Sequence, residues 1–68
     1  MKFYCISASL VKSNNTVTSY WIQSELYAAR YRVEAEEMFR RDIADWLNQG
    51  FQVKAISTKD ITDFIVNH

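Results

Sequence analysis

The chain has 68 residues, of which 49% are hydrophobic and 24% charged, so it is long enough for one small globular domain and too short for two domains or a dinucleotide-binding fold. Eight basic residues balance eight acidic ones, which argues against a polyanion-binding surface. One cysteine and one histidine can form neither an internal disulfide nor a zinc site of the ordinary type.

The first residues resemble the start of a signal peptide for a few positions, but we expect no targeting segment. The apolar stretch that begins at Phe3 is diluted by Ser7 and Ser9 and ends at Lys12, and no small-residue cleavage site follows it. No apolar run is long enough to span a bilayer. We therefore expect a cytoplasmic protein whose single thiol, Cys5, is reduced.

Residues 2–12 alternate with the period of a β-strand. Ser13-Asn14-Asn15 predicts a turn, because asparagine tolerates the left-handed conformation of tight hairpins. Residues 16–24 are rich in β-branched and aromatic types and predict a second strand. The face of the first strand that we expect to be buried carries Tyr4, Ile6, Ala8 and Leu10.

The length of the turn decides which face of this hairpin is buried. A three-residue loop, which we favour, places Tyr20 and Ile22 beside the apolar face of the first strand. A two-residue loop places Val17 and Trp21 there instead. Because a slip of one residue exchanges the two faces of a strand, the choice also decides which side chains point outward.

From Ser24 to Gln49 the hydrophobic period becomes helical, with Ser24 as the N-cap. Arginines and carboxylates gather on the opposite face at spacings that allow ion pairs. Gly50 is expected to end the helix in the left-handed conformation. The face that we expect to be buried carries Ala28, Ala35, Phe39, Ile43 and Trp46.

Residues 51–57 predict a third strand, whereas residues 58–68 fit either a fourth strand, which we favour, or a short helix. The predicted order is ββαβ followed by one of these two elements. This order predicts a single α+β domain over residues 1–68. It is a two-layer sandwich in which one long helix packs on a sheet of three or four strands.

One helix can cover only one side of the sheet, so the other side meets solvent or a partner. The outward face of the favoured hairpin is unusually apolar for a solvated surface, which is typical of an interface. A tail folded over this face, or the other register, would explain the same residues without an interface. The residues that we predict to form the interface are Phe3, Val11, Val17 and Trp21.

No arrangement of residues predicts catalysis. A nucleophilic Cys5 would need a base within reach, and His68 is the last residue of the chain. The carboxylates between Glu25 and Asp45 alternate with arginines, as on a solvated helix face. A single glycine excludes a phosphate-binding loop. We therefore expect no enzyme, no cofactor, no metal site and no small-molecule substrate.

The sequence thus predicts a non-catalytic interaction module that binds a protein partner or a second copy of itself, as a homodimer. Its size and layout resemble those of small phage and prophage accessory proteins, which often block a host protein, although no motif carries this resemblance. The alternative is a nucleic-acid-binding regulator that uses the same face. It is less favoured because only Lys2 and Lys12 bring positive charge to the hairpin.

Overall fold

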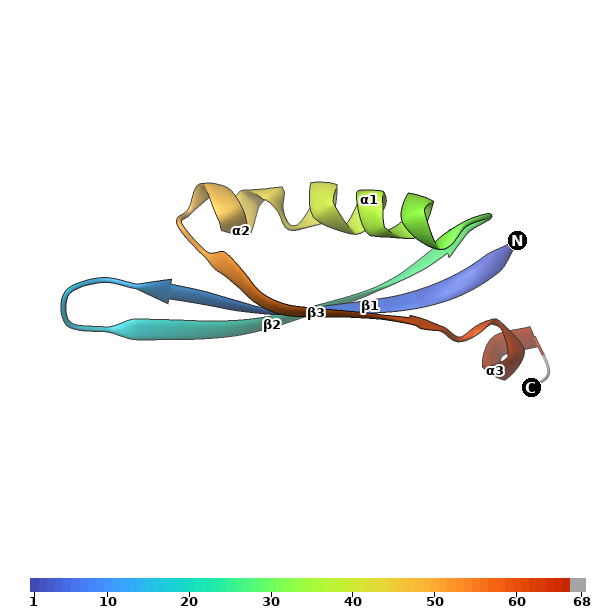
Figure 1. Cartoon of the computed structure of the whole chain (residues 1–68), viewed down its shortest axis with the longest axis horizontal. Helices are drawn as coiled ribbons and strands as arrows, with labels where there is room; N and C mark the ends of the chain where they lie inside the picture. Colours follow the sequence, from blue (N-terminus) through green and yellow to red (C-terminus); the bar gives the residue numbers. More distant parts are fainter. Residues whose placement is uncertain (67–68) are drawn as a thin grey trace.

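The computed structural model describes residues 1–66. A three-stranded sheet carries two helices across one face, and a third short helix lies at the opposite side near the N-terminus (Figure 1). In chain order the elements are β1 (Lys2–Ser13), β2 (Thr18–Ala29), α1 (Arg32–Asp42), α2 (Ala44–Asn48), β3 (Gln52–Asp60) and α3 (Thr62–Val66).

The sheet is antiparallel throughout, in the order β2-β1-β3, so the first strand of the chain lies in the centre. The predicted α+β class, with helix packed on sheet, is confirmed. The sheet has three strands. A β-bulge interrupts the pairing of β1 with β3 between Ser9 and Leu10, where Lys54 is the additional residue of β3.

The predicted boundary between second strand and helix is wrong. β2 continues through Ser24 to Ala29, and α1 begins at Arg32 after the extended residue Tyr31. Residues 25–29 include good helix formers, but β1 offers them a full ladder of backbone hydrogen bonds, with Lys2 opposite Ala29. Pairing between strands therefore overrides local helix propensity here.

The single long helix that we predicted is divided into two short ones at Ile43. This residue has φ −91° and ψ 0°, outside the helical region, and its side chain is nonetheless buried against the sheet. After the break, α2 carries Trp46 over the hairpin, where its ring stacks on that of Trp21. The predicted end is confirmed, because Gly50 follows α2 with φ +100°, a conformation that favours glycine.

Neither loop length considered for the hairpin is correct. Ser13 pairs with Thr18, so four residues form the turn. Asn14 does direct the turn, but through its side chain, whose Oδ1 accepts hydrogen bonds from the backbone N–H groups of Thr16 at 3.0 Å and Val17 at 2.7 Å. Among the described residues, none other than glycine has a positive φ. The resulting faces are those of the register that we did not favour.

The preferred strand at the tail is also wrong, and the short helix is confirmed within residues 58–66; residues 67 and 68 lie outside the described part. β3 continues to Asp60, whose carboxylate accepts hydrogen bonds from the backbone N–H and hydroxyl of Thr62. These hydrogen bonds, with help from Lys2, hold the pKa of Asp60 below its ordinary value. Ile61 donates its N–H to the carbonyl of Phe3, which fastens α3 to the start of β1.

The core lies between the helices and β1. The predicted buried face of β1 is confirmed, as is the burial of the central residues of the predicted helix. Ala28 was expected on that helix face but lies in β2 and is exposed. The buried residues are Tyr4, Ile6, Ala8, Leu10, Ala29, Ala35, Phe39 and Ile43.

Tyr27 joins β2 to the end of α1 and predicts a pH dependence of stability. Its hydroxyl donates a hydrogen bond of 2.5 Å to Asp42, and its ring packs edge-on against Phe39. Burial, and then Asp42, raise the pKa of Tyr27 above its ordinary value. The folded protein therefore holds this proton more tightly than the unfolded chain. The stabilisation is complete below a pH of about 10 and is lost as the pH rises above it.

We expect the free energy of unfolding to fall more steeply above about pH 10 in the wild type than in Tyr27→Phe. Urea titrations at several pH values would measure both curves. The other tyrosines and the lysines are common to the two proteins, so the difference between the curves isolates Tyr27. Parallel curves would show that its proton is not linked to folding.

Candidate interaction surface

The face of the sheet opposite α1 and α2 is the candidate functional site, and we call it the open face. Within the described residues, α3 covers only its end beside the start of β1 (Figure 1). The strand pairing and the alternation along each strand place these residues on it: Phe3, Cys5, Ser7, Ser9 and Val11 of β1, Tyr20, Ile22, Ser24, Leu26 and Ala28 of β2, and Gln52, Lys54, Ala55, Ser57 and Lys59 of β3.

Only two of the four predicted interface residues lie on the open face, at its two ends. Phe3 and Val11 lie on the open face and are half-buried. Val17 lies in the hairpin turn. Trp21 pairs with Leu10 and points to the helix side, where its ring stacks on Trp46 with 4.8 Å between centroids. The outward placement of Trp21 is therefore wrong, because it depended on the register of the hairpin.

The most exposed apolar side chains of the open face were missed for the same reason. Tyr20, Ile22 and Leu26 are 70%, 71% and 65% exposed, and they form a ridge along β2. Their alternation with polar Ser19, Gln23 and Glu25 was visible in the sequence. The favoured register instead placed Tyr20 and Ile22 in the core, and residues 25–29 were expected to be helical.

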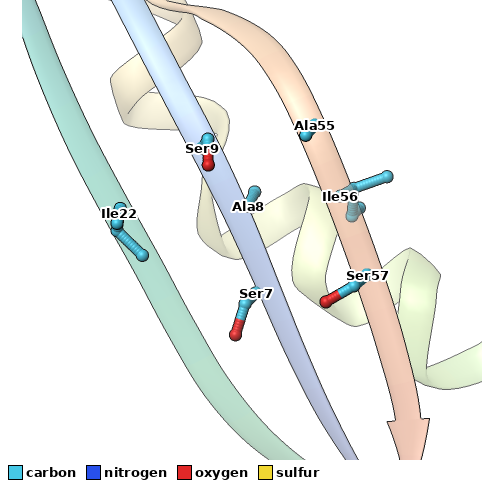
Figure 2. Close-up of a pocket in the computed structure, with 7 residues that line it drawn as sticks. All are labelled: Ser7, Ala8, Ser9, Ile22, Ala55, Ile56 and Ser57. Atoms are coloured by element: carbon cyan, nitrogen blue, oxygen red, sulfur yellow. The ribbon is translucent and has the colours of Figure 1, made fainter.

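Beside the ridge lies a shallow depression of about 140 Å³ that we call the central hollow (Figure 2). The large side chain of its lining is Ile22, at one margin. Ile56, at the other margin, pairs with Ala8 on the helix side, and its side chain points away from the hollow (Figure 2). The hydroxyls of Ser7 and Ser24 are hydrogen-bonded to each other at 2.7 Å beside it. The lining consists of Ser7, Ala8, Ser9, Ile22, Ala55, Ile56 and Ser57.

Toward the hairpin turn the open face is hollowed again, to about 350 Å³, where Tyr20 faces β3. The Nζ of Lys54 lies 5.9 Å from the centroid of the Tyr20 ring, a cation–π contact between the two edge strands. The β-bulge places Lys54 at this position. Lys54 and Lys59 are the charged residues among the strand positions of this face, and both belong to β3.

The lysines that we expected to carry positive charge on the hairpin lie elsewhere. Lys2 forms an ion pair with Asp60 at 3.7 Å, and Lys12 lies over the ring of Phe51. Both are on the helix side of β1 by their register. A nucleic acid on the open face would therefore meet Lys54 and Lys59 instead.

Within residues 1–66, no three side chains of the metal-binding types converge, and no helix has the length and apolar character needed to cross a bilayer. Cys5 is half-buried on the open face, and it carries a free thiol. The candidate base His68 lies outside the described residues. No family model, curated protein or solved structure matches this chain.

Proposed function

We propose that this chain is a non-catalytic protein-interaction module that binds a protein partner, or a second copy of itself, through the open face. The observation that carries the proposal is the ridge of Tyr20, Ile22 and Leu26, three large side chains that are each about two-thirds exposed on one face of β2, with Ser24 between the second and the third. Burying one such side chain stabilises a complex by about 1.5 to 3 kcal/mol. Contiguous groups of this kind usually mark an interface.

The structure changes which residues we propose as anchors. Ile22 and Leu26 replace Trp21, because the indole of Trp21 already packs against Trp46 within the chain. Phe3 and Val11 stay in the proposed interface at its two ends. Anchors of this type carry most of the binding free energy, and the surrounding serines exclude water.

The cellular setting belongs to the same proposal. A free thiol at Cys5 suits a reducing compartment such as the cytoplasm. An accessory or inhibitory role of the phage or prophage type, in which the module covers a host protein, is one form of this function. It is supported by the size and layout of the chain alone.

The alternative, a nucleic-acid-binding regulator, is supported by the contact of Lys54 with Tyr20 on a face whose strands carry no carboxylate. Two lysines would release few counterions, so such binding would be weak and would disappear with modest salt. Phe3 and Tyr20 lie at opposite ends of the face, where they cannot stack on adjacent bases. A protein surface fits the apolar ridge better.

The test compares tagged wild-type protein with the double variant Ile22→Lys/Leu26→Lys. Val33→Lys is the control, because Val33 is also an exposed apolar residue, at 56%, but lies on α1. All three proteins should keep the wild-type circular dichroism spectrum. We expect the double variant alone to lose association, whether measured as self-association by light scattering or as capture of a protein from a nuclease-treated lysate.

Two results would overturn the proposal. One is a wild type that neither associates with itself nor captures any protein that the double variant fails to capture. The other is retention of single-stranded nucleic acid at low salt that is lost in Lys54→Gln/Lys59→Gln but kept in Ile22→Lys/Leu26→Lys. That second pattern would favour the nucleic-acid alternative.

A further inference from the structure

The elongated shape of the chain and its large accessible surface indicate that part of this surface contacts a partner. Its radius of gyration is 13.9 Å, with extents of 48 × 20 × 13 Å, whereas a compact chain of this length has about 11 Å. Its accessible surface is 5148 Å². A monomer of 8.0 kDa is expected to expose about 4,450 Å². The excess of about 700 Å² is close to the roughly 800 Å² that each partner buries in a stable complex.

We propose that the open face is covered by a second copy of this chain, packed face to face about a two-fold axis. This inference rests on the proposed function and specifies its partner. A partner in a two-fold dimer must be complementary to the same surface that it covers. The open face meets this condition, because it carries a ridge and a hollow side by side.

The strand register aligns these two features. Ile22 of the ridge lies opposite Ser9 of β1, and Ser9 lies opposite Ala55 of β3, so the three residues form one row across the sheet. Ile22 is the large member of the row, and the other two line the central hollow (Figure 2). A second copy, rotated by 180° about an axis parallel to β1, places its own Ile22 over that hollow. Ile22 of each copy then fills the hollow of the other copy.

The charges favour the same arrangement. With the axis along β1, β2 of each copy lies over β3 of the other. Lys54 and Lys59 then face the apolar ridge and the ring of Tyr20, and the lysines of the two copies stay at opposite edges. A dimer that placed β3 over β3 would bring like charges together in a desolvated interface, which is costly. It would also leave both hollows unfilled.

Cys5 gives a direct test of this geometry in the natural sequence. It lies on the open face of β1, so the axis places it across from its own copy. Packed sheets are about 10 Å apart, a distance that a short bismaleimide spans. We expect the wild type to have twice the monomer mass by light scattering and to give a covalent dimer with the reagent. Cys5→Ser should keep the mass and lose the cross-link.

Ile22→Lys should weaken the dimer by about 30-fold or more and remove the cross-link at the same protein concentration, because a lysine would enter the hollow. Val33→Lys should change neither the affinity of the dimer nor the yield of the cross-link. A wild type that is monomeric at every concentration would overturn the inference. A dimer that is insensitive to Ile22→Lys, or that never links through Cys5, would also do so, because it would use another surface such as the free edge of β2.

These outcomes separate the inference from the proposed function. A monomeric wild type that captures a protein through Ile22 and Leu26 would overturn the second copy as partner and leave the interaction module intact. A monomeric wild type without such capture would overturn both. A dimer that shows the expected sensitivity to Ile22→Lys and the Cys5 cross-link supports both.

Discussion

Phe39→Ala is expected to lower the free energy of unfolding by about 3 to 5 kcal/mol, the largest effect of any single truncation that we propose. The Phe39 side chain is fully buried between α1 and the sheet, and its ring meets that of Tyr27 at 6.4 Å. A domain of this length is stable by only about 3 to 10 kcal/mol. The core is one layer deep, so the sheet cannot close over the cavity.

Urea titrations followed by circular dichroism, all at one protein concentration, would measure this loss. Val33→Ala on the same helix is the control and should change the free energy by less than about 0.5 kcal/mol, because Val33 is exposed. Should Phe39→Ala unfold without denaturant, a titration with a stabilising osmolyte recovers the comparison. A loss of under about 1 kcal/mol would contradict the buried position of this ring.

Trp46→Ala is expected to cost about 2 kcal/mol, less than a fully buried tryptophan because its side chain is only partly covered. Trp46 links three parts of the chain. Its ring stacks on Trp21 of β2 at 4.8 Å and meets Phe51, before β3, edge-on at 5.6 Å. Removing it should free the end of the hairpin from α2.

A double-mutant cycle with Trp21→Ala tests the stack directly, and we expect a coupling free energy of about 1 kcal/mol. Leu47→Ala, the neighbouring position on α2, is the control and should not couple to Trp21. Trp21→Ala by itself should reduce stability and leave association through the open face unchanged. Additive effects of Trp21→Ala and Trp46→Ala would show that the stack adds nothing to stability.

The parts of this fold that could be predicted from sequence are those that depend on local pattern. The alternation of β1 identifies its buried face, because period two has one solution once a strand is recognised. The burial of Ala35, Phe39 and Ile43 follows from helical spacing in the same way. Gly50 ends the helical region as expected, since only glycine adopts its φ without strain.

What could not be predicted depends on pairing between distant residues. The segment from Glu25 to Ala29 has good helix propensity, yet β1 draws it into the sheet. The turn has four residues because the side chain of Asn14 accepts backbone hydrogen bonds, an interaction that spacing alone does not reveal.

The register of the hairpin between β1 and β2 decides which residues lie in the candidate site. An apolar outer face was predicted, and such a face exists. Its main residues differ from those predicted, however, because the observed register places Trp21 on the helix side and Ile22 on the open face, the reverse of the expected arrangement. Phe3 and Val11 kept their face because they belong to β1, whose buried side was already fixed by its own pattern.

The central place of β1 has a consequence during synthesis. This strand is synthesised before both of its neighbours and gains β2 after a short turn, but its other neighbour, β3 (Gln52–Asp60), is synthesised only after the helical segment. Until then one edge of β1 has unpaired backbone groups, a template for any extended chain nearby. Slow translation between Ala29 and Gln52 lengthens that interval. Nascent chains on one messenger RNA are therefore most prone to pair with one another through this edge before β3 has emerged.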